Sequence, residues 1–106
     1  MAQYLLLAAA IIAEVMGTLA LKASEGLTRA VPSFVMAAGY VGAFVALSQV
    51  LKLGMPVGAA YAIWASAGVG LVAIAGNVLF GESLSARAIV GIGLIIVGVL
   101  LVETGH

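Results

Sequence analysis

One acidic residue, Glu14, lies within a long apolar stretch and is the residue best placed to do chemistry. It is the only charged residue among the first 21, and the next is Lys22, eight positions further on. An ionisable side chain at bilayer depth costs about 2.5–3.5 kcal/mol on insertion scales. Eight residues of helix span about 12 Å, so Lys22 is too far away to neutralise the acid. Glu14 must therefore bind a proton, be solvated, or pair with a cation from outside the chain, as a transport site requires.

Helical spacing predicts that small or weakly polar residues surround this acid. Leu7, Ala10, Gly17 and Thr18 share one face of the predicted helix with Glu14. Small neighbours leave space beside the carboxylate, and the Thr18 hydroxyl can hydrogen-bond to it from one turn away. We therefore predict that this face lines a substrate pocket. A purely structural hydrogen bond to a neighbouring helix is the alternative, but a neutral glutamine would provide it at lower cost.

Two further segments place aromatic residues on one face of a helix. Tyr40 and Phe44 are spaced i, i+4, and Tyr61 and Trp64 are spaced i, i+3, with Gly68 one turn beyond. Aromatic faces attract cations by about 2 kcal/mol or more when the cation is desolvated. These residues are therefore candidate walls of a cation site. Tyr61 and Trp64 are equally compatible with an aromatic belt at the membrane surface.

The composition indicates that lipid, and not water, surrounds this chain. Of its 106 residues, 65% are hydrophobic and only 8% are charged, too few to form the exterior of a soluble domain. Because a spanning helix needs about 20 residues, we predict one all-α membrane domain over 1–106. Its expected spans are 3–22, 33–52, 58–80 and 85–103. Four such helices are expected to pack as a bundle too narrow for a wide path, so the working unit should be a dimer.

The remaining residues exclude several classes of function. The chain has no cysteine and zero net charge, and it shows no metal-ligand spacing, phosphate loop or nucleophile–base pair. We therefore expect no enzyme, metal site, cofactor or nucleic-acid partner. Gly91 and Gly98 are seven residues apart and predict a close helix–helix seam. The charged residues near the span ends are expected to snorkel or to be solvated: Lys22, Glu25, Arg29, Lys52, Glu82, Arg87 and Glu103.

The segments that carry these features resemble the small multidrug resistance transporters. Residues 13–22 and 24–33 are similar to the first helix and first loop of that family, and they read AEVMGTLALK and SEGLTRAVPS. Residues 56–68 resemble its third-helix signature and read PVGAAYAIWASAG. Residues 89–101 resemble its fourth helix and read IVGIGLIIVGVLL. The resemblance covers the whole chain.

This resemblance implies proton-coupled export of lipophilic and quaternary ammonium cations by an antiparallel homodimer in the bacterial inner membrane. It further implies that protons and substrate compete for Glu14. The other roles that it implies are a pocket wall at Tyr40, Tyr61 and Trp64, a dimer seam at Gly91 and Gly98, and a kinked third helix at Ser66–Gly68. The family pattern W-x-G-x-G has Ser66 at its first glycine here, and a serine can support a kink by bonding back to the helix.

Several alternatives stay open at this point. Guanidinium exporters of the family carry a tryptophan two or three places after the acid, whereas Met16 and Gly17 stand here. The sequence thus favours the quaternary ammonium subtype over an exporter of guanidinium, polyamines or lipids with the same fold. A membrane partner subunit that does not transport is another interpretation. A rotary-ring proteolipid also uses a lone carboxylate, but four spans argue against it. The partner is either a second copy or a paired homologue.

Overall fold

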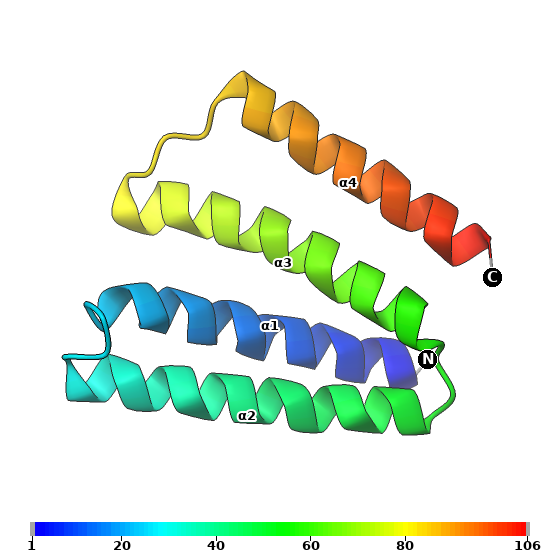
Figure 1. The fold of residues 1–106 in the computed structure, drawn as a ribbon, viewed down its shortest axis with the longest axis horizontal. Coiled ribbons are helices and arrows are strands. Elements are labelled where there is room, and N and C mark those ends of the chain that lie inside the picture. Colours follow the sequence, from blue (N-terminus) through cyan, green and yellow to red (C-terminus); the bar gives the residue numbers. More distant parts are fainter. Residues whose placement is uncertain (1, 106) are drawn as a thin grey trace.

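Four long α-helices make up the computed structural model, which describes residues 2–105. They are α1 (Ala2–Ala23), α2 (Ala30–Lys52), α3 (Val57–Phe80) and α4 (Ala86–Thr104) (Figure 1). All four are long and apolar enough to cross a membrane. The predicted all-α fold with four spanning helices is therefore confirmed. α2 begins three residues earlier than expected, because Pro32 lies in its first turn, where a missing N–H removes no intrahelical hydrogen bond.

The helices form a flat layer in the order α2, α1, α3, α4 (Figure 1). The layer measures 42 × 34 × 18 Å between Cα atoms. Within the described chain, α4 contacts α3 but neither α1 nor α2, and none of its residues is buried. The expected packed bundle is therefore wrong for the single chain, since a bundle would close its core against the fourth helix.

The closest helix packing joins α1 and α2. A β-carbon at Gly39 would lie 2.7 Å from the carbonyl oxygen of Ala13 and 3.1 Å from the Cα of Gly17. A β-carbon at Gly17 would in turn lie 3.2 Å from the ring of Tyr40. Glycine permits this approach because it has no side chain between the two backbones. Because Gly17 is one helical turn from Glu14, this contact places Tyr40 within about 10–12 Å of the Glu14 backbone.

A turn centred on Ser24 reverses the chain between these two helices. The buried Ser24 hydroxyl donates to the carbonyl of Leu21 at 2.6 Å and accepts from the N–H of Leu27 at 3.0 Å. Glu25, Gly26 and Leu27 follow one another with φ angles of 52°, 75° and 69°. Three successive left-handed residues turn the chain sharply, which sets α2 antiparallel to α1.

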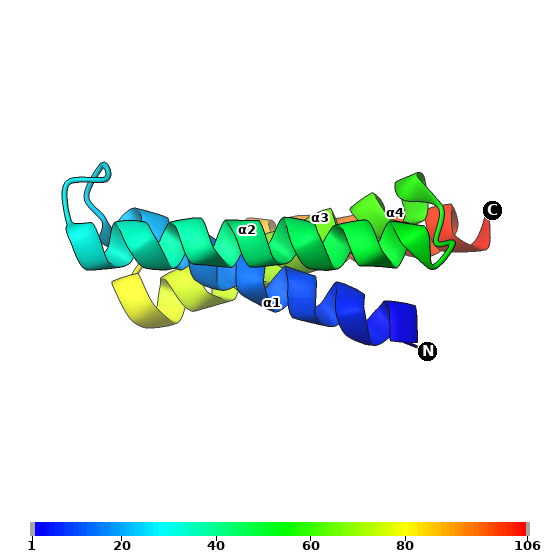
Figure 2. The same cartoon turned by 90° about the horizontal axis from the view of Figure 1, so that it is seen from below.

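α3 crosses α1 obliquely, and the crossing positions the candidate site. Figure 2 shows the N-terminal end of α3 on one side of the layer and its C-terminal end on the other. Near the crossing, a β-carbon at Gly68 would lie 3.3 Å from Oε2 of Glu14. The buried apolar core is shared by α1, α2 and α3 and by the loop before α3, and consists of Leu7, Ile11, Val15, Ala43, Val50, Met55, Ala60 and Trp64.

Candidate functional site

A cavity of about 560 Å³ lies between α1, α2 and α3. Its lining combines one carboxylate, four aromatic rings and a floor of small or β-branched residues. These residues are Glu14, Tyr40, Phe44, Tyr61, Trp64, Ala65, Gly68, Val69 and Val72. Its volume falls within the usual range of small-molecule sites, about 300–1,000 Å³. The cavity is therefore large enough for an organic cation of drug size.

The two oxygens of Glu14 have different surroundings. Oε1 accepts a hydrogen bond of 3.1 Å from the Thr18 hydroxyl, whose oxygen lies 2.8 Å from the hydroxyl of Tyr40. When Glu14 is ionised and accepts the one hydroxyl proton of Thr18, the hydroxyl of Tyr40 is left to donate to Thr18. Oε2 is buried and has no hydrogen-bond partner within residues 2–105. A buried carboxylate oxygen without a partner is costly, so a proton or a bound cation would stabilise it.

The aromatic side chains are held against one another around this carboxylate. The rings of Phe44 and Trp64 pack edge to face with centroids 5.4 Å apart, and those of Tyr61 and Trp64 with centroids 6.4 Å apart. Trp64 is buried, whereas Tyr61 remains exposed. Edge-to-face packing fixes the orientation of the tryptophan ring. The arrangement offers a cation both a negative charge and aromatic surfaces.

The structure places some of the predicted pocket residues elsewhere. Leu7, Ala10 and Gly17 are buried in the helix packing and do not line the cavity, contrary to our prediction. Their face of α1 is turned toward α2 and α3, and Glu14 is the only residue of α1 that lines the cavity. Thr18 does not line the cavity either, but its hydroxyl connects two residues that do, Glu14 and Tyr40, through hydrogen bonds.

Three lining residues of α3 escaped the sequence analysis. Ala65, Val69 and Val72 follow Tyr61 at helical spacing and continue its face. The same spacing that links Tyr61 to Trp64 and Gly68 would have identified them. They make the floor of the cavity apolar, which suits the hydrocarbon part of a lipophilic cation.

The predicted kink and dimer seam stay predictions. α3 runs as an uninterrupted helix through Ser66–Gly68, and the Ser66 hydroxyl donates to the carbonyl of Ile63 at 3.1 Å. This is the back-bonding that can accompany a bend. On α4, a β-carbon at Gly91 or Gly98 would meet no atom of the described chain within 4 Å.

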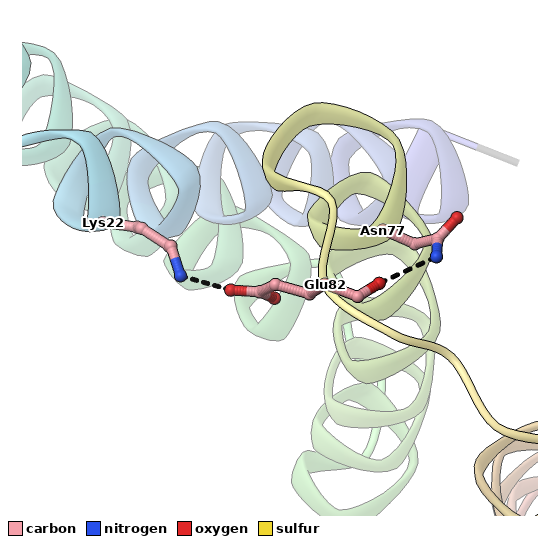
Figure 3. A network of polar contacts seen from close by, with 3 residues as sticks. All are labelled: Lys22, Asn77 and Glu82. Carbon is pink, nitrogen blue, oxygen red and sulfur yellow. Dashed lines mark hydrogen bonds and ion pairs between the residues drawn. The ribbon is translucent and has the colours of Figure 1, made fainter.

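A polar cluster joins the ends of α1 and α3 (Figure 3). Lys22 forms an ion pair with Glu82, and its ammonium nitrogen lies 5.3 Å from the centre of the Phe80 ring. The Asn77 amide donates to the carbonyl of Glu82 at 2.8 Å. Both side chains remain about half exposed, as expected for charges at span ends, and their pairing was not foreseen from the sequence. We call Lys22, Phe80 and Glu82 the boundary cluster.

Comparison with known proteins shows extensive similarity. The family model described as Small Multidrug Resistance protein matches residues 2–95. The chain is 47% identical to the quaternary ammonium compound-resistance protein QacF of Klebsiella aerogenes, covering 97% of this chain and 93% of that protein. It is 44% identical, with the same coverage, to a multidrug transporter of Pseudomonas aeruginosa. It is 46% identical to QacE of Escherichia coli over 94% of this chain and 90% of that protein.

Proposed function

The chain belongs to the small multidrug resistance family, and on this premise we propose that it exports lipophilic and quaternary ammonium cations in exchange for protons. The observation that carries the proposal is the buried Oε2 of Glu14, which lacks a partner among residues 2–105 and lines an aromatic cavity. The names of the relatives, which specify multidrug transport and quaternary ammonium resistance, support this class of substrate.

Proton and cation compete for one carboxylate in this proposal. Either one neutralises Glu14, and among residues 2–105 of the same chain no second acid lines the cavity. A bare carboxylate is costly in an apolar environment, so the site changes its access from one membrane face to the other only when it is neutralised. A proton gradient then drives the organic cation outward.

The aromatic residues select among cations. Phe44, Tyr61 and Trp64 present ring surfaces beside Glu14. Quaternary ammonium and delocalised aromatic cations carry little hydration, so they lose little when they enter such a site, and they gain cation–π attraction. Small hydrated metal ions lose more hydration and gain nothing from the apolar floor.

The transporting unit in this proposal is an antiparallel dimer. Two observations support a dimer: the cavity lies open at the face of a flat layer, and α4 has no buried residue within the described chain. Gly91 and Gly98 leave a stripe of α4 open for a partner helix. A second copy running in the opposite direction would cover this stripe with its own.

Cysteine cross-linking would test both the seam and its direction, since the chain has no native cysteine. Ala88 and Val102 are exposed, lie beside the glycine stripe and are separated by about 21 Å along the helix. In an antiparallel dimer, a mixture of Ala88→Cys and Val102→Cys protein forms the mixed disulfide. Disulfides between identical variants alone would indicate a parallel pair, and none at all would argue against this seam.

The main test of the function is binding of tetraphenylphosphonium to purified protein across a range of pH. Wild-type affinity for tetraphenylphosphonium is expected to rise with pH, because Glu14 loses its proton at higher pH and is then free to bind the cation. Glu14→Asp should move the midpoint of this dependence, and Glu14→Gln should abolish binding. Glu25→Gln is the control, since Glu25 lies in the loop between α1 and α2. Binding that ignores pH, or a Glu14→Gln variant that transports normally, would refute the proposal.

A further inference from the structure

We propose that Glu82 and Phe80 form a second, weaker site for organic ammonium ions, which the side chain of Lys22 fills in this structure. The site lies at the C-terminal end of α3, outside the cavity that holds Glu14. The proposal rests on the export function proposed above and adds a place where cations bind near the membrane surface.

The boundary cluster already holds an ammonium group. The Lys22 ammonium contacts Oε2 of Glu82 (Figure 3). It also lies 5.3 Å from the centre of the Phe80 ring. A carboxylate and an aromatic face are the same two groups that the cavity offers to a cation. A cation within about 6 Å of a ring centre is attracted by the π-face. Lys22 therefore acts as a tethered ligand that marks the site.

Glu82 is positioned by contacts that do not involve Lys22. Its carbonyl accepts from the Asn77 amide at 2.8 Å, and its N–H donates to the carbonyl of Gly76 at 3.3 Å. Its carboxylate lies over Gly76, where a β-carbon would come within 2.5 Å of Oε1. Because α3 itself supplies these contacts, the backbone of Glu82 keeps its place when the ammonium of Lys22 moves away, and the absent side chain of Gly76 leaves room for the carboxylate.

Lys22 can be displaced because the pair is open to solvent. The side chains of Lys22 and Glu82 are 54% and 50% exposed. Exposed ion pairs are weak and are screened by salt, so a free cation can compete for Glu82. Lys22 is about 12 Å along α1 from Glu14, so the boundary cluster lies roughly two helical turns from the acid of the cavity.

The test uses Glu14→Gln protein, in which the cavity has lost its charge, and benzyltrimethylammonium as the probe. Saturable shifts of the Phe80 and Glu82 amide NMR signals in nonionic detergent report on the site. Adding Lys22→Met is expected to tighten binding about two- to fivefold, since the tethered competitor is gone. Adding Glu82→Gln to that double variant is expected to abolish the saturable shift.

Two matched variants separate a local site from general charge effects. Lys52→Met removes the same charge from the end of α2, and Glu103→Gln removes the same charge from the end of α4. Neither is expected to change the shifts at Phe80. The absence of saturation with Lys22→Met, or binding that survives Glu82→Gln, would overturn the proposal. Because Glu14 is already replaced, neither result bears on whether Glu14 couples protons to export.

Discussion

The hydroxyl of Thr18 is the residue-scale feature that connects the acid of the cavity to its aromatic wall. It bonds to Glu14 at 3.1 Å and to Tyr40 at 2.8 Å. Thr18→Val keeps the side-chain shape but removes both hydrogen bonds. We expect tetraphenylphosphonium affinity to fall about five- to tenfold, the equivalent of roughly one hydrogen bond of about 1 kcal/mol. Equilibrium binding at fixed pH measures the change.

Two comparisons make this result specific. Thr28→Val removes a hydroxyl that bonds only to loop carbonyls of Ser24 and Glu25, so affinity should not change. Tyr40→Phe should weaken binding as Thr18→Val does, and the double variant should be little worse than either one, because the three groups form one chain. Fully additive losses would mean that Thr18 and Tyr40 act separately.

Sequence reasoning identified the charged and aromatic residues of the cavity but not all of its lining. Glu14, Tyr40, Tyr61 and Trp64 line one cavity as the pattern of acid and aromatic residues suggested. Helical spacing could identify which residues share the face of Glu14, but not which part of that face a neighbouring helix would cover. Ala10 and Leu7 are buried for this reason. The partner of Lys22 was also missed, since Glu82 is sixty residues away in the chain.

At the scale of helices, the contact between α1 and α2 depends on a single missing side chain. Gly39→Ala would press a methyl group against the backbone of Ala13 and Gly17, which cannot rotate away. Overpacking of this kind costs about 1–3 kcal/mol, so the midpoint of thermal unfolding in detergent should fall. Gly42→Ala, on the same helix but with no atom of the described chain within 4 Å, should leave it nearly unchanged. Equal effects of the two variants would refute this account.

The positions of the helices could be predicted because long apolar stretches are a strong signal of spanning helices. The packing of the helices against one another could not be predicted. Three expected spans lie within one residue of the observed ends, while α2 extends to Ala30. The oblique crossing of α1 and α3 depends on how Gly68 fits against Glu14, which hydropathy does not encode. The prediction of a packed bundle was wrong for the single chain, because the sequence of α4 does not indicate whether its neighbouring helix belongs to the same chain.

At the scale of the whole molecule, the proposed dimer depends on α4. Gly91 and Gly98 share one face of α4, and Gly93 lies on the opposite face. A side chain at Gly98 or Gly93 meets no atom of the described chain within 4 Å, so neither Gly98→Val nor Gly93→Val should unfold it. We expect Gly98→Val to reduce the dimer fraction at least tenfold in cross-linking, and Gly93→Val to leave it unchanged. A similar loss in both would indicate that the glycine stripe is not the seam.

The isolation of α4 also bears on how the protein is made in a cell. α1 and α2 pack tightly through a short turn, so this hairpin can form as soon as both helices enter the membrane. α4 follows these helices in the chain and, within the described residues, contacts only α3. If the transporter is the proposed dimer, its assembly requires two chains to meet in the bilayer, and the rate of assembly depends on the square of their density there. Cells that synthesise little of this protein would hold mostly inactive single copies, and resistance should appear abruptly as expression rises.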